Sequence, residues 1–299
     1  MASSTVFLSE RSGPWSPRFG QFTPQIRAFL RNPAGVAGLS LLLLMLLTAL
    51  IAPLLYPGDP LDMVARPLLR PGQDLRFPLG TDSLGRDVVA GLAHGARISL
   101  LIGFSAVSIS LLIGTLIGTV AGYFGGWLDD LLVHLTELFQ TLPTFLFVIV
   151  LVTIGKPSVM LITLSIGVAS WPTIARLARA EFRSLRESDF VMAARSLGYS
   201  NSRIIFREIL PNALPPIIVT TSVMVATAIL NESALSFLGL GDPNVVSWGS
   251  MIGAGREMLR TAWYLTAFPG AMIVLAVLSL NLLGDALNDA LNPRLRELS

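Results

Sequence analysis

The sequence has no cysteine, a single lysine and only two histidines among its 299 residues. Without cysteine the chain can form neither disulfide bonds nor zinc–thiolate sites, and we expect no metal site in it. The lysine, Lys156, is followed by Pro157, so the G-x-x-x-x-G-K-[ST] pattern that cradles nucleotide phosphates is missing. The chain therefore cannot hydrolyse ATP in that way, and we predict that it is not an enzyme.

Charged residues are scarce as well, at 13% of the chain, against about 25% in ordinary soluble domains. The net charge of +2 is too small to suggest a nucleic-acid partner. Apolar residues make up 53% and gather in runs of roughly 18 to 25, long enough to cross about 30 Å of hydrocarbon as a helix. We predict an all-α integral membrane protein with six transmembrane helices surrounded by lipid, at about 35–56, 98–121, 131–154, 158–179, 214–232 and 265–287.

The distribution of basic residues predicts the orientation. With six spans both ends of the chain lie on one side, and a cytoplasmic N-terminus puts thirteen of the 21 basic residues inside. We therefore expect cytoplasmic segments at 1–34 and 291–299 that flank a transmembrane domain at 35–290. The predicted loops of that domain are external at 58–97, cytoplasmic at 180–213 and external at 233–264.

A polar stretch, residues 187–210, lies between two predicted spans. Its pattern predicts a first short helix to about Ser196, ended by Gly198 in the left-handed conformation. A second helix is expected to run to about Leu210, where Pro211 stops it. We call residues 187–210 the coupling segment and expect it to touch a partner outside the lipid; an amphipathic element lying in the membrane interface is the alternative.

The coupling segment resembles a loop of importer-type ATP-binding-cassette (ABC) permeases with the pattern E-A-A-x3-G-x9-I-x-L-P. Ala193-Ala194, Gly198 and Leu210-Pro211 match it, whereas Met192 stands where the family often has Glu and Glu208 where it often has Ile. Four further segments are similar to the subfamily that moves dipeptides, oligopeptides or nickel: LGTDSLGRD at 79–87, AGYFGG at 121–126, SFLGLGDPNVVSWG at 236–249 and NLLGDALNDALNPRLR at 281–296.

This resemblance implies the type I importer permease fold in a bacterial cytoplasmic (inner) membrane, with the chain as the second permease subunit. It implies three kinds of partner: a homologous permease, two cytoplasmic ATPases that hold ATP and Mg, and an extracytoplasmic substrate-binding protein. It also implies contact with an ATPase at Asp189, Met192, Ala193, Ala194, Arg195, Gly198 and Pro211.

One face of the fifth span is the candidate pore surface. Thr220, Thr227 and Asn231 recur at helical spacing, with Met224 between them. A weakly polar, uncharged face suits the passage of peptides. The alternative is that the hydroxyls bond back to their own helix.

The motif at 79–87 is the candidate external site. Asp82 can cap a helix through Arg86, so the motif either supports the structure or, with Asp87, contacts a delivery protein outside. Trp248 is expected near the outer end, either in an interfacial aromatic belt or in an external gate.

Two structural patterns accompany these sites. Gly114, Gly118 and Gly122 recur every fourth residue and predict close helix packing. Four arginines (Arg176, Arg179, Arg183 and Arg186) form a stripe after the fourth span that either reaches lipid headgroups or docks on a soluble partner.

Two other classes of membrane protein fit less well. Gly239 to Asp242 reads G-x-G-D, as in intramembrane aspartyl proteases, but the candidate partners Asp285 and Asp289 belong to the opposite side of the membrane. A secondary transporter requires ionisable residues buried at mid-membrane, whereas Glu137 and Glu232 fall near span ends.

Overall fold

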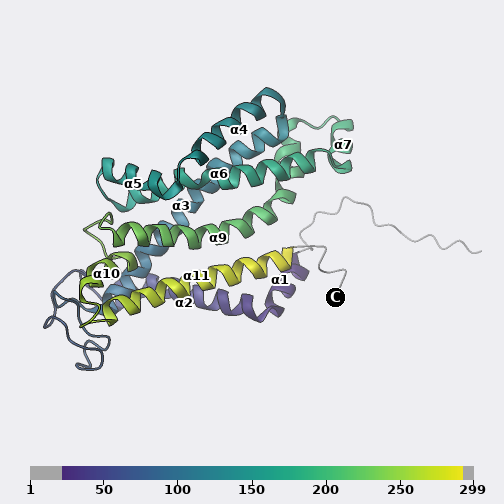
Figure 1. The fold of residues 1–299 in the computed structure, drawn as a ribbon. Coiled ribbons are helices and arrows are strands. Elements are labelled where there is room, and N and C mark those ends of the chain that lie inside the picture. Colours follow the sequence, from purple (N-terminus) through teal and green to yellow (C-terminus); the bar gives the residue numbers. More distant parts are fainter. Residues whose placement is uncertain (1–21, 292–299) are drawn as a thin grey trace, which may run out of the picture.

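The computed structural model describes residues 22–291, which are helical apart from their turns and loops and contain no extended strand. Residues 1–21 and all but the first residue of the predicted tail 291–299 lie outside this range. The long helices run side by side as a bundle (Figure 1). They are α2 (Pro33–Leu55), α3 (Val88–Phe124), α6 (Val159–Arg186), α9 (Leu210–Phe237) and α11 (Tyr264–Leu291), and the shorter α4 (Gly126–Thr141) and α5 (Thr144–Gly155) pack against α6.

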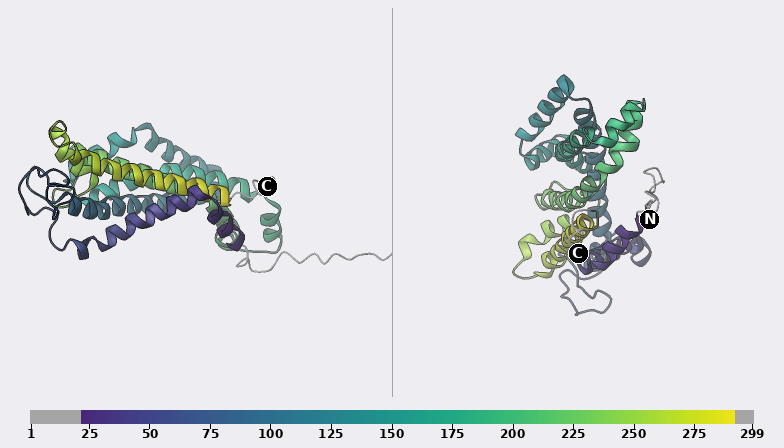
Figure 2. Two further views of the ribbon diagram at one scale, coloured as in Figure 1. Left: turned by 90° about the horizontal axis from the view of Figure 1, so that it is seen from below. Right: turned by 90° about the vertical axis from the view of Figure 1, so that its right-hand side faces the viewer.

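Shorter elements lie at the two ends of this bundle. At one end are α1 (Phe22–Arg31) and α7 (Asp189–Ser196), and at the other are α10 (Trp248–Gly255) and the ordered loop 57–87, here called the strap (Figures 1 and 2). Asn32 at the start of α2 donates to Asp289 near the end of α11, at 3.3 Å. The two ends of the described chain therefore lie together, as an even number of crossings requires.

Within residues 22–291, five helices are long and apolar enough to cross a membrane. The predicted span 131–154 is not one straight helix, because α4 and α5 meet at a break with a bend of 79°. Leu142 is extended, the conformation that a following proline imposes on the residue before it, and Pro143 begins the new direction. Counting the bent pair as one crossing gives six.

Both predicted external loops are shortened, because helices extend into them. The strap ends at Asp87 instead of residue 97, because the Asp87 carboxylate accepts the Val89 N–H at 2.9 Å and caps α3. The loop predicted at 233–264 begins only after Phe237 and contains α10. Apolar run length marks the part of a helix inside the lipid, and both helices extend beyond that part.

The second helix of the coupling segment does not end at Pro211. Residues from Asn201 to Phe237 form one continuous 37-residue helix, made of α8 (Asn201–Arg203), a π-helical turn η2 (Ile204–Ile209) and α9. Proline removes one backbone donor and crowds the carbonyl four residues earlier. The wide turn immediately before it accommodates this, as π turns commonly do within helices. The prediction that Pro211 stops the helix was wrong.

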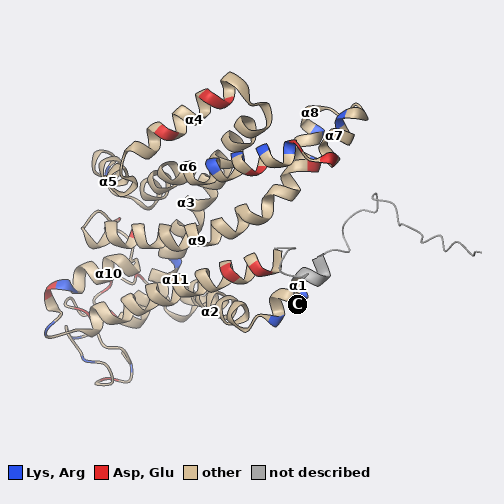
Figure 3. Ribbon diagram, turned by 45° about the vertical axis from the view of Figure 1, so that its right-hand side comes forward, with Lys and Arg blue, Asp and Glu red and all other residues tan. Residues whose placement is uncertain are grey.

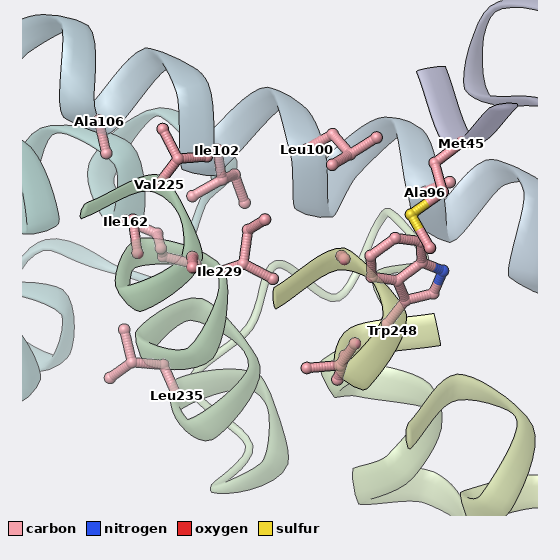
Figure 4. Close-up of a cluster of buried hydrophobic side chains, with 14 of the residues drawn as sticks. Met45, Ala96, Leu100, Ile102, Ala106, Ile162, Val225, Ile229, Leu235 and Trp248 are labelled. Atoms are coloured by element: carbon pink, nitrogen blue, oxygen red, sulfur yellow. The ribbon is translucent and has the colours of Figure 1, made fainter. Parts of the chain in front are cut away.

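Two hydrophobic clusters hold the bundle together. The larger includes Ile102, Ile162, Leu235 and the indole of Trp248 (Figure 4), and the smaller surrounds Phe182 near α7. The glycine stripe of α3 packs closely against α6, because a side-chain carbon on Gly114 would lie 2.7 Å from the Trp171 carbonyl oxygen. The predicted close packing through this stripe is confirmed.

Candidate coupling and transport surfaces

Helix α7 ends in a turn that only a residue tolerant of positive φ can form easily. Gly198 has φ +75°, as the sequence predicts. The Tyr199 N–H donates to the Ala194 carbonyl at 3.1 Å and the Gly198 N–H to Arg195 at 2.9 Å. These two bonds form a Schellman motif, which satisfies carbonyls that the helix end would leave unpaired.

One face of α7 packs inward and the other is exposed. Val191 and Ala194 are buried against the π turn, within the cluster around Phe182. Met192 is 51% exposed. Of the other predicted coupling residues, Asp189, Ala193, Arg195, Gly198 and Pro211 are exposed. Ala194 is thus the one member of the predicted set that supports the helix from below.

Three exposed apolar residues near α7 were missed by the sequence analysis. Phe190, Leu197 and Phe206 are 41%, 61% and 61% exposed. Together with Met192 they give this end of the molecule an apolar surface. Local spacing gave no signal for Phe190, because it lies four residues before the buried Ala194 on the same side of α7.

The coupling segment is tied to the end of α3 through one tyrosine. The Tyr123 hydroxyl donates to the Asn201 side chain at 2.9 Å, and the Arg195 guanidinium lies 5.7 Å from the centre of the Tyr123 ring. Arg186 donates to the Tyr123 carbonyl at 3.1 Å. A cleft of about 380 Å³ opens beside these groups and is bordered by Met192. These contacts connect the coupling segment to α3 and α6.

The candidate pore face is only weakly polar. The hydroxyls of Thr220 and Thr227 donate to carbonyls one turn earlier in their own helix, at 2.9 and 3.1 Å. Met224 packs between the two hydrophobic clusters, and Asn231 is half-buried. Of the four residues Thr227 is exposed. The threonine hydroxyls thus bond to their own helix, as the alternative interpretation predicted. That this face lines a pore stays a prediction.

Three of the four predicted external residues lie around a small cleft, which we call the outer cleft after that prediction. Asp82 accepts the N–H groups of Leu84 and Arg86, both at 2.8 Å, so it shapes a turn and does not cap a helix. Asp87 caps α3, and burial raises the pKa of its carboxyl. The cleft, of about 80 Å³, lies between the strap and α10 and is lined by Asp82, Arg86 and Asp87. The buried Nε of Arg86 has no partner among the described residues.

Trp248 belongs to the core. Its side chain is fully buried, the indole N–H donates to the Leu92 carbonyl at 3.1 Å, and the ring packs near Met45 and Ala96 (Figure 4). The expectation that this residue lies in an interfacial belt was therefore wrong, and its place in an external gate stays a prediction. Tryptophan marks interfaces only on average, and here its N–H finds a partner inside the protein.

Basic residues gather along the end of α6 and on the coupling segment (Figure 3). Arg179 forms a bidentate pair with Asp129 of α4, with N–O distances of 2.5 and 2.7 Å. One member of the arginine stripe therefore joins two helices of this chain, which neither interpretation of the stripe had included. Arg183 is exposed and borders a cleft of about 310 Å³ beside the turn from α3 to α4.

The acidic residues do not form a proteolytic pair. Asp242 accepts the Val159 N–H at 3.1 Å, where the loop before α10 meets the start of α6. Asp289 lies at the other end of the bundle, beside Asn32. Within residues 22–291 no three His, Asp or Glu side chains converge as metal ligands would.

Comparison with known proteins agrees with this geometry. Residues 114–297 match the family described as binding-protein-dependent transport system inner membrane component. The chain belongs to this family. Residues 23–71 match the N-terminal transmembrane domain of oligopeptide transport permease C.

Two curated relatives resemble nearly the whole chain. A di/tripeptide transport system permease protein, DppC, of Pseudomonas aeruginosa is 39% identical over 276 residues, which cover 90% of this chain and 91% of the relative. A dipeptide transport system permease protein, DppC, of Alkalihalophilus pseudofirmus is 38% identical over 284 residues, covering 95% and 91%.

Solved structures show the same fold. A chain of the inward-facing MetNI methionine ABC transporter superposes with a TM-score of 0.56 at 16% identity and covers 68% of this chain and 96% of its own. A chain of an amino acid ABC transporter has a TM-score of 0.52 at 16% identity and covers 66% and 92%. The chain thus has the fold of ABC importer permeases and is a transmembrane permease component.

Proposed function

We propose that this chain is the permease subunit of an ATP-driven importer that moves di- or oligopeptides across the bacterial cytoplasmic membrane. In this proposal it pairs with a homologous permease, takes its energy from two cytoplasmic ATPases that bind ATP and Mg, and receives substrate from an extracytoplasmic binding protein. The N-terminus and α7 lie in the cytoplasm, and the strap and α10 lie outside. The names of the curated relatives support the peptide substrate.

The observation that carries the coupling role is the exposed α7 at the end of a continuous 37-residue helix. An apolar surface around Met192 suits insertion into a cleft on a soluble protein, because its burial there is favourable. The buried contacts of Val191 and Ala194 with the π turn make α7 move with α9. ATPase closure at one end is thereby converted into movement of a helix that crosses the membrane.

Site-directed cross-linking tests this role, because a chain without cysteine reports only the cysteine placed in it. Met192→Cys should form a cross-link to the ATPase in inner membranes that contain the whole complex. Arg76→Cys is the control, since Arg76 is more exposed than Met192, at 81% for its side chain against 51%, but lies in the strap at the opposite end. Absence of an ATPase adduct at Met192, or an equal yield at Arg76, would refute the proposed docking.

Uptake measurements identify the substrate. A strain that lacks its own peptide importers and expresses the complete complex should accumulate a labelled dipeptide, and Met192→Asp should reduce that accumulation. Nickel or another small solute of the same subfamily is the competing substrate. Accumulation of nickel without peptide would replace the peptide assignment and leave the coupling role unaffected.

A further inference from the structure

One buried carboxyl has no role in the mechanism above. Glu232 of α9 is 1% exposed, although the sequence placed it near the end of a span and gave no sign that it is buried. An ionised side chain in such a place is costly unless hydrogen bonds or a counter-charge compensate it. No basic residue pairs with it among the described residues, so hydrogen bonds alone must accommodate it.

Serine hydroxyls provide those bonds. Ser99 of α3 donates to Glu232 at 3.2 Å, Ser236 of α9 at 2.8 Å and Ser233 at 3.4 Å. Ser247, just before α10, lies 3.5 Å from the Ser236 hydroxyl. The cluster thus brings together α3, α9 and the beginning of α10, three elements far apart in the sequence.

The cluster also holds the backbone of α10. The Trp248 N–H, in the first turn of α10, donates to the Ser99 hydroxyl at 3.2 Å. Ser247 and Ser250 form a reciprocal capping box at the same point. The hydroxyl of Ser99 therefore accepts from α10 and donates to Glu232, so that the carboxyl orients the hydroxyl that anchors α10.

Helix α10 in turn forms one wall of the outer cleft. Val246, Ser250 and Met251 line that cleft opposite the strap residues Asp82 and Arg86. A shift of α10 would change the shape of the cleft directly, because its residues form part of the lining. This connects a buried carboxyl to a surface at the outer end of the molecule.

We infer that Glu232 is a positioning residue: its carboxyl, through Ser99, Ser233 and Ser236, seats α10 against α3 and α9 and so sets the shape of the outer cleft. The inference rests on the proposed function only in naming that cleft as part of the surface that meets the binding protein. The packing of α10 against α3 and α9 is a property of this chain and can be measured without transport.

The rate at which a buried cysteine reacts with a label reports whether α10 is held in place. Val246→Cys in the full complex provides the parent, because Val246 is 8% exposed while α10 is in place. Adding Glu232→Ala should increase the rate of reaction with a membrane-impermeant maleimide about fivefold or more, because the buried serine hydroxyls lose their acceptor. Glu232→Gln keeps the volume and one acceptor oxygen, and it should return the rate close to that of the parent.

Two further variants keep the test decisive. Ser110 lies on α3, as Ser99 does, and its buried hydroxyl donates to the Gly167 carbonyl of α6 at 2.8 Å. Ser110→Ala removes this hydroxyl and should leave the labelling rate unchanged. Ser99→Ala keeps the carboxyl but removes the link to α10, so it should accelerate labelling even if Glu232→Ala does not reach the membrane. Parent-like rates in both Glu232→Ala and Ser99→Ala would overturn the inference, as would equal acceleration by Ser110→Ala or by Glu232→Gln.

The connection to the binding protein has its own readout. In proteoliposomes, Glu232→Ala should increase the binding-protein concentration needed for half-maximal stimulation of ATP hydrolysis, with basal hydrolysis unchanged. An unchanged concentration together with faster labelling would overturn the assignment of the cleft. A parent complex that shows no stimulation at all would count against the proposed function, while the labelling rates would still decide whether Glu232 seats α10.

Discussion

Replacing Gly198 with valine isolates the turn that ends α7. A Cβ built at Gly198 meets nothing within 4 Å, so the position has open space for a side chain. The penalty comes from the backbone alone, because φ is +75°. For L-residues the left-handed conformation costs about 1–2 kcal/mol, and β-branched side chains tolerate it least.

That penalty is large enough to change the population of the turn. A free-energy change of 1–2 kcal/mol alters an equilibrium about 5- to 30-fold, which favours conformers that lack the Tyr199–Ala194 and Gly198–Arg195 bonds. The bundle does not depend on these bonds, so thermal unfolding in detergent should be unaffected. We expect the amount of substrate imported per ATP hydrolysed to fall about fivefold or more, while hydrolysis itself continues.

Proteoliposomes that contain the purified complex and the binding protein allow both rates to be measured in one sample. Gly198→Asn is the matched control, since asparagine adopts positive φ more readily than other side chains; it should retain most of the coupling. A parent-like ratio in Gly198→Val, or equal losses in the valine and asparagine variants, would refute the role assigned to this turn.

Three other predictions concern packing and charge. Trp248→Ala should lower the free energy of unfolding by about 3–5 kcal/mol, as for a large core side chain; a loss near zero in detergent unfolding would indicate a surface position. Gly118→Leu should destabilise by about 1–3 kcal/mol through overpacking of α3 against α6, whereas Gly270→Ala, with nothing within 4 Å, should be neutral or stabilising. Burial raises the pKa of Asp242, but hydrogen bonds from the backbone N–H groups of Asn244 and Val159 outweigh this and leave the pKa below its ordinary value. The stabilisation from this lowered pKa is present above the unfolded pKa and is lost as pH falls below about 4; Asp242→Asn should remove that part of the acid-dependent change in melting temperature.

Length and apolarity were enough to predict most of the bundle from the sequence. Runs of apolar residues located the crossings, and the glycine stripe of α3 indicated a close helix contact, because both are properties of a single segment. The bend at Pro143 is less predictable. Its angle of 79° depends on how α4 and α5 pack on neighbouring helices, which local sequence does not specify.

The candidate sites were less predictable where burial decides the chemistry. The turn at Gly198 followed from local rules, since helix termination is a short-range property. Trp248 and Glu232 were assigned to span ends by their position along the chain. Both are buried because α10 folds back onto α3 and α9. A contact between residues about 150 positions apart leaves no local pattern, and only the tertiary structure reveals it.

The π turn at 204–209 has a geometric consequence for the way force could pass along the chain. A regular α-helix advances about 100° per residue, so converting this turn to α geometry would rotate α7 by roughly that angle about the axis of α9. The same helix reaches the serine cluster some thirty residues further on. A small change of helical pitch near one membrane surface would therefore rotate α9 as well as translate it, and both movements would reach the opposite surface.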